Sequence, residues 1–114
     1  MKKILLFLSV LLTYSNSFAQ IDVTATSGTP FASYATLKDA FDALNSGTQT
    51  GTITIAISGN TTETASAVLN ASGTGGANYT TITISPTGGV LRTISGNLAS
   101  ALVDLNGADN VTID

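Results

Sequence analysis

The feature that most constrains the fold is a short alternating segment that returns at a fixed distance along the chain. Thr and Ile alternate at 52–55, and similar segments follow at 81–84 and 110–113, each 29 residues further on. Such alternation is typical of a half-buried β-strand, and a fixed offset of roughly 20 to 50 residues is typical of stacked repeats. Leu69 and Leu98 keep the same offset. We therefore predict a repeating core made of Ile53, Ile55, Ile82, Ile84, Val111 and Ile113.

Two further apolar stretches lie between the second and third alternating segments, at 90–94 and 102–105, with Gly, Asn and Ser turns around them. Three short strands in each interval of about 29 residues are what a parallel β-helix requires. Asn106-Gly107 can also form a tight hairpin turn, which would favour an antiparallel sandwich. Chance alignment of Thr/Ile segments is a further alternative in a chain this rich in Thr. The repeat favours the parallel β-helix.

One amphipathic helix is expected at 37–46, ahead of the repeats. Thr36 is positioned to be its N-cap and Gly47 its αL stop. Asp39 and Asp42 fall in its first half, where the helix dipole favours anions; the alternative is a carboxylate pair for acid–base chemistry. We predict that the helix caps the first coil of the repeats. Its apolar face consists of Leu37, Ala40, Phe41 and Leu44.

The first residues have the three parts of a secretory signal peptide. Two lysines open the chain, an apolar run covers 4–12, and Ser17 and Ala19 are the small residues that signal peptidase accepts. The alternative, a transmembrane anchor, needs about 20 apolar residues, which this run does not reach. We predict that residues 1–19 are removed by a cut between Ala19 and Gln20, and that the protein is secreted or lies on the outer cell surface.

Composition excludes nucleic acid as a partner and also excludes disulfides, lipid attachment at a cysteine and a second membrane-spanning segment. Loss of Lys2 and Lys3 moves the net charge from −3 to −5 and leaves two basic residues, too few for the phosphate contacts that nucleic acid binding needs. The chain has no cysteine, so disulfides and a lipidated cysteine are excluded. No second apolar run is long enough to span a membrane. Solubility must rest on hydroxyl and amide side chains.

Several segments carry a resemblance to known families. The helix segment 34–44, followed by the strand 51–55, resembles the N-terminal part of right-handed β-helix proteins of the pectin-lyase-like superfamily. The segments 65–73 and 105–114, and the junction 18–20, are similar to large secreted surface proteins of Bacteroidetes. Those proteins often end in a type IX secretion sorting domain. The resemblance implies an extracellular surface protein and brings no catalytic motif.

The sequence thus predicts an all-β fold, a right-handed parallel β-helix fragment with an N-terminal capping helix. Residues 1–19 would be the signal peptide and 20–50 an N-terminal strand with the capping helix. Residues 51–114 would be the first coils, truncated at the C-terminus.

The expected function is that of a non-enzymatic, adhesin-like or structural segment whose partner is extracellular polysaccharide or a cell-surface component. No catalytic, cofactor-binding or metal-binding residues are assigned, and no cofactor is expected. Asp104, Asp109 and Asp114 recur every five residues, which suits turns better than a paired site. One alternative is the N-terminal portion of a polysaccharide-degrading lyase or glycosidase whose site lies downstream. Another is an ice-binding ladder of outward threonines, at 52–54 and 81–83.

Overall fold

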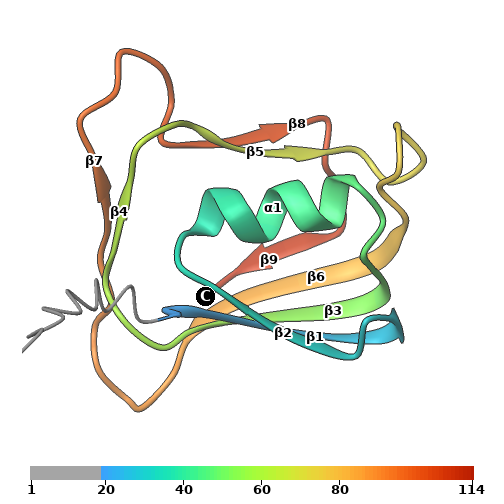
Figure 1. Cartoon of the computed structure of the whole chain (residues 1–114), viewed down its shortest axis with the longest axis horizontal. Helices are drawn as coiled ribbons and strands as arrows, with labels where there is room; N and C mark the ends of the chain where they lie inside the picture. The colour runs from blue at the N-terminus through green and yellow to red at the C-terminus, as the bar shows by residue number, and fades with distance from the viewer. Residues whose placement is uncertain (1–18) are drawn as a thin grey trace, which may run out of the picture.

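The computed structural model describes residues 19–114, so the predicted signal peptide lies outside the described residues except for Ala19 (Figure 1). Nine strands and one helix follow one another along this part of the chain. In chain order they are β1 (Ile21–Gly28), β2 (Phe31–Tyr34), α1 (Leu37–Asn45), β3 (Gln49–Ile57), β4 (Thr61–Glu63), β5 (Ala67–Asn70), β6 (Tyr79–Pro86), β7 (Ile94–Gly96), β8 (Val103–Asn106) and β9 (Val111–Ile113).

The largest sheet is mixed, and its five strands lie in the order β2-β1-β3-β6-β9. β1 runs antiparallel to both neighbours, with Ile21 opposite Tyr34 on β2 and opposite Ile57 on β3. β6 is parallel to both β3 and β9. The sheet therefore changes from antiparallel to parallel pairing at β3.

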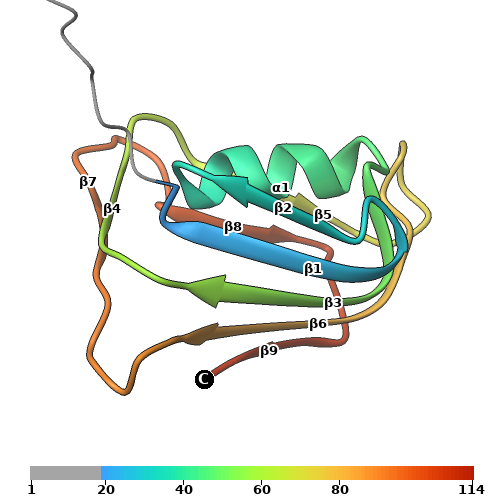
Figure 2. The same ribbon diagram turned by 60° about the horizontal axis from the view of Figure 1, so that its bottom comes forward.

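Two smaller sheets complete the walls around a shared interior (Figure 1). β4 pairs in parallel with β7, and β5 pairs in parallel with β8. Figure 2 shows the strands of the large sheet stacked below α1, with β9 farthest from the helix, and β8 lying below β5. The strands β3, β4 and β5 thus form one layer, and β6, β7 and β8 form the next.

The repeating Thr/Ile segments lie side by side in the register that the sequence indicates. Ile53 is opposite Ile82, and Ile82 is opposite Val111. Two residues further along the same strands, Ile55 is opposite Ile84, and Ile84 is opposite Ile113. Because directly opposed residues of paired strands share a face, these side chains all point into the interior.

The predicted fold class, an all-β right-handed parallel β-helix, is nevertheless wrong. Antiparallel strands open the largest sheet, a helix packs on the core, and the described residues form no closed solenoid. The first reason is β1, which pairs with β3 from Ile21 to Gly28 in an antiparallel register. Its alternate residues Ile21 and Val23 are fully buried, so apolar burial holds this strand in the sheet.

The second reason is that the 29-residue spacing does not extend to the other walls. Thr61 on β4 pairs with Ile94, 33 residues on, and Ala67 on β5 pairs with Val103, 36 residues on. Leu69 accordingly pairs with Leu105 and not with Leu98, as the fixed spacing would require. A long turn at 71–78 follows β5, whereas only residues 107–110 separate β8 from β9. Because the turn at 107–110 is shorter than the one at 71–78, the 29-residue spacing is restored where β9 pairs with β6.

α1 covers one end of the interior. Its buried residues are those of the predicted apolar face, and it ends at Asn45, one residue before the predicted Ser46. Gly47 follows with φ +78°, and a Cβ there would lie 2.6 Å from the carbonyl oxygen of Gly76. A side chain at this position would therefore collide with the 71–78 turn as well as strain the backbone. The core comprises Ile21, Val23, Leu37, Ala40, Phe41, Leu44, Ile53, Ile55, Ile57, Ala67, Leu69, Ala77, Tyr79, Ile82 and Ile84.

Asn45 joins the last turn of α1 to the edge of β5. Its Nδ2 donates a hydrogen bond of 2.8 Å to the Val68 carbonyl, and its Oδ1 accepts one of 2.9 Å from the Asn70 amide. One side-chain amide thus supplies both the donor and the acceptor that a neighbouring strand would supply to β5.

Replacing Asn45 with Ala should lower the free energy of unfolding by about 2 kcal/mol, because two hydrogen bonds of about 1 kcal/mol each are lost from half-buried backbone groups. Asn45→Asp should be comparably harmful, since a carboxylate cannot donate to Val68. Urea unfolding followed by circular dichroism measures both. Ser46→Ala, which removes exposed hydroxyl contacts to the Ala43 carbonyl and the Thr48 hydroxyl, is the matched control. Equal midpoints for Asn45→Ala and Ser46→Ala would contradict this role.

Candidate functional site

The first candidate for chemistry is the carboxylate of Glu63, which is only 2% exposed. It lies at the N-terminus of α1, where its Oε1 accepts from the Leu37 amide at 2.9 Å and its Oε2 from the Lys38 amide at 3.0 Å. Thr61 donates its hydroxyl to Oε1 at 3.0 Å. Both carboxylate oxygens therefore already accept hydrogen bonds from the protein itself. The negative charge of the carboxylate also interacts favourably with the dipole of α1. Glu63 is a structural group that joins β4 to α1.

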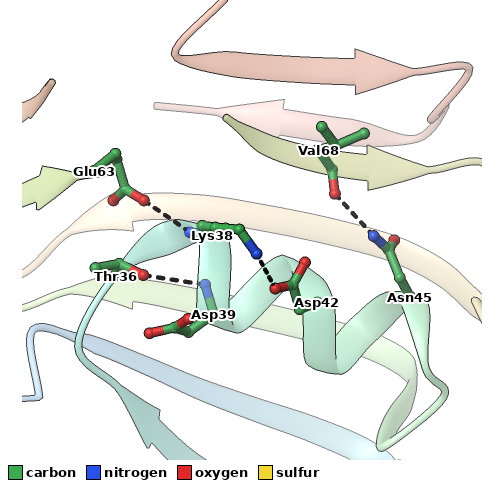
Figure 3. A network of polar contacts seen from close by, with 7 residues as sticks. All are labelled: Thr36, Lys38, Asp39, Asp42, Asn45, Glu63 and Val68. Carbon is green, nitrogen blue, oxygen red and sulfur yellow. Dashed lines mark hydrogen bonds and ion pairs between the residues drawn. The ribbon is translucent and has the colours of Figure 1, made fainter. Parts of the chain in front are cut away.

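The remaining charged groups of the helix are arranged along its outer side (Figure 3). The Thr36 hydroxyl accepts from the Asp39 amide at 3.1 Å, which confirms Thr36 as the N-cap. Asp42 forms an ion pair with Lys38, one turn earlier, and its hydrogen bond raises the pKa of the Lys38 amine. Asp39 and Asp42 thus serve the cap and the surface, and nothing brings them to a common substrate position.

The other carboxylates of the repeats lie apart from one another. Asp104 is on β8, Asp109 is in the following turn, and Asp114 follows β9, all of them exposed. Within residues 19–114 no group of three acidic, histidine or cysteine side chains could hold a metal ion. No pocket opens anywhere in that same stretch. A convergent catalytic arrangement is therefore not found in the described part of the chain.

Two tyrosines sit at polar contacts on the inner side of the walls. The Tyr34 hydroxyl donates to Oε1 of the fully buried Gln49 at 3.1 Å, and the Tyr79 hydroxyl donates to the Asn70 carbonyl at 2.6 Å. Burial raises the pKa of both phenols, because the charged form loses hydration. The Tyr34 hydroxyl thus joins β2 to β3, and the Tyr79 hydroxyl joins β6 to β5.

The outer face of the large sheet has a different character. Thr24 on β1 is opposite Thr54 on β3, Thr54 is opposite Thr83 on β6, and Thr83 is opposite Thr112 on β9. All four side chains are exposed. Four threonines therefore form one straight row across four hydrogen-bonded strands, and neighbouring strands lie about 4.8 Å apart. We call these residues, together with Phe31, the threonine row.

Phe31 ends the row at the edge strand. It is opposite Thr24 in the β1–β2 register and is 57% exposed. The next rank holds two carboxylates: that of Asp22, which accepts a 2.6 Å hydrogen bond from the Ser33 hydroxyl, and that of Asp114, which follows β9. The face is thus rich in hydroxyl groups, with one aromatic ring at its side and two carboxylates beside the row.

The sequence predicts part of this row, because outward threonines at 52–54 and 81–83 are expected on one face. Asn110 stands where a third pair would begin. The structure places Thr112 in the row and adds Thr24, which comes from an antiparallel strand outside the repeat. Phe31 was not singled out. The sequence feature that marks Phe31 is its position directly after Thr29-Pro30, in a chain with few aromatic residues.

The chain matches no protein-family model, no curated protein and no solved structure. Among the described residues no helix is both long and apolar enough to cross a membrane.

Glu63→Ala should lower the free energy of unfolding by about 2 to 3 kcal/mol, because two amides at the start of α1 and the Thr61 hydroxyl lose their acceptor in a buried place. Glu63→Gln should cost less, since the amide oxygen can still accept from one of them. Thr64→Ala, at an exposed position just after β4, is the control. Chemical denaturation of the three variants tests this order. A Glu63→Ala protein as stable as Thr64→Ala would show that the carboxylate does not secure the helix.

Proposed function

We propose that this chain is an exported, non-enzymatic module that binds extracellular polysaccharide through the outer face of its largest sheet. The threonine row, ending at the exposed ring of Phe31, is the single observation that carries the proposal. Each threonine presents a hydroxyl that can both donate and accept, which suits the hydroxyl groups of sugars. The aromatic ring offers an apolar surface on which a pyranose ring can lie.

The spacing of the row supports an extended glycan lying across the strands. Strands repeat about every 4.8 Å, which is close to the length of one sugar in an extended β-linked chain. Such a glycan would meet one threonine on each strand and reach Phe31 with its last ring. The sparse charge of this face, together with the negative net charge of the protein, favours a neutral glycan over an acidic one.

The alternative of a polysaccharide-degrading enzyme is not supported by any observation on residues 19–114. Hydrolysis or elimination requires carboxylates or a base to converge on one bond. Here the buried carboxylate of Glu63 binds the start of α1, and the other carboxylates lie on separate strands, turns and the helix. Binding without turnover is the function that the outer face supports.

Ice binding is the second candidate, because the row contains four threonines in register instead of the two pairs apparent in the sequence. Regular hydroxyl and methyl groups on a flat face could order water into a lattice. A thermal-hysteresis measurement decides the matter. Activity that disappears in Thr54→Val and Thr83→Val would support ice binding, and no hysteresis at millimolar protein would remove it.

Polysaccharide binding is tested by co-sedimentation of the purified protein with cellulose and chitin and by titration with soluble β-glucan oligosaccharides. Phe31→Ala should weaken binding about tenfold, the loss expected from one aromatic contact of about 1 to 1.5 kcal/mol. Thr54→Val with Thr83→Val should weaken it several-fold, since hydroxyls are lost while the strand preference remains.

The matched control is Thr62→Val, an exposed threonine on β4 and outside the row. It should bind as the parent protein does. Retention on none of these glycans, or an equal loss in all three variants, would contradict the proposal.

A further inference from the structure

One carboxylate lies close to the aromatic ring that ends the threonine row. Asp22 is two residues before Thr24 on β1, so the two side chains point to the same outer face. Phe31 on β2 is opposite Thr24, which makes Asp22 its diagonal neighbour across the β1–β2 pair. Diagonal neighbours of paired strands lie roughly 7 to 8 Å apart, within reach of an aromatic side chain. A ligand group that rests on the ring can therefore touch the carboxylate as well.

The Asp22 carboxylate is held from one side only. The Ser33 hydroxyl, opposite it on β2, donates a 2.6 Å hydrogen bond to Oδ1. The opposite residue on β3 is Ala56, whose methyl group cannot donate. Within residues 19–114 no group donates a hydrogen bond to Oδ2, and no cation forms an ion pair with this carboxylate. An ionised carboxylate accepts about four hydrogen bonds, so most of its capacity is free for a ligand.

The ligand that this arrangement fits has an apolar face and hydroxyl groups along its rim. A pyranose ring has both, because its C–H groups can lie on an aromatic ring while its hydroxyl groups point outward. Hydrogen bonds to a carboxylate are shorter and stronger than those to a neutral oxygen. A sugar that itself carries a carboxylate would instead be repelled. The arrangement therefore distinguishes a neutral sugar from its uronic acid.

We propose that Phe31, Asp22 and Ser33 form a subsite for one neutral sugar, at the end of the glycan that lies over β2. The subsite rests on the proposed function, glycan binding by the threonine row, and names the residues that select the sugar. The sugar lies with its apolar face on the ring of Phe31, and two of its adjacent hydroxyl groups donate to the Asp22 carboxylate. Ser33 is a positioning residue, because its hydrogen bond orients that carboxylate.

A role in stability alone is the alternative for Asp22 and Ser33, since cross-strand pairs also hold neighbouring strands together. Such a role would not distinguish one sugar from another by charge. The test therefore compares two hexasaccharides with the same linkage: neutral cellohexaose, and the β-1,4-linked hexamer of glucuronic acid. Isothermal titration calorimetry measures the affinity of the purified protein for each.

Asp22→Asn should weaken cellohexaose binding about fivefold, because a charged acceptor is replaced by a neutral one that accepts weaker hydrogen bonds. The same variant should bind the glucuronic acid hexamer more tightly than the parent does, since the repelling charge is gone. Its urea midpoint should stay near that of the parent, because the new amide oxygen can still accept from the Ser33 hydroxyl. Asp104→Asn is the matched control: it removes the same charge from an exposed position on β8, outside the large sheet, and should leave both affinities unchanged.

Ser33→Ala separates the orientation of the carboxylate from its charge. Cellohexaose binding should weaken about threefold, the loss expected when one hydrogen bond no longer holds the acceptor in place. The charge of Asp22 remains in this variant, so the glucuronic acid hexamer should bind as weakly as it does to the parent. A gain in affinity for the acidic hexamer would contradict the positioning role of Ser33.

Failure of the subsite and failure of glycan binding give different results. If the parent binds cellohexaose and Phe31→Ala weakens that binding, unchanged affinities in Asp22→Asn would overturn the subsite and leave the proposed function intact. An equal loss of affinity for both hexasaccharides in Asp22→Asn would also overturn the subsite, because it would show a role in stability alone. A parent protein that binds no neutral β-glucan would overturn the proposed function and the subsite together.

Discussion

The rest of the structure depends on how one end of the strand stack is closed. Strands of the first layer present backbone groups and apolar side chains that must be paired or covered. α1 meets both needs, since its apolar face covers the interior and its Asn45 side chain pairs with the backbone of β5. In return, the Glu63 carboxylate of β4 accepts from the first amides of the helix. Side-chain hydrogen bonds thereby attach α1 to β4 and β5, with which a helix cannot form the backbone hydrogen bonds of a sheet.

Local features were the ones that the sequence could predict. The spacing of Leu37, Phe41 and Leu44, with Thr36 before them and Gly47 after them, defines the helix within one turn at either end. The strand register in the large sheet was also predictable, because near-identical Thr/Ile segments align with themselves. Both depend on residues that are neighbours in the sequence or copies of one another.

Features that depend on unlike segments were missed. Glu63 meets the helix 26 residues before it, and nothing around it in the sequence marks a cap for a helix elsewhere. β1 alternates apolar and polar residues as the repeats do, yet the direction of its pairing is set by packing and not by alternation. That one antiparallel strand overturned the predicted β-helix and extended the threonine row. Unequal turns explain why Leu69 meets Leu105, since pairing tolerates insertions at the corners.

The threonine row follows from the alternation of side chains along each strand. Successive residues of a strand point to opposite faces, so Thr112 faces the row while Ile113 faces the interior. The same alternation places Asp22 and Asp114 on the outer face, one rank beyond the row. The charged neighbours of the row are therefore carboxylates, which repel an acidic glycan and do not repel a neutral one. One set of strand pairings thus builds the apolar interior on one side and the proposed glycan surface on the other.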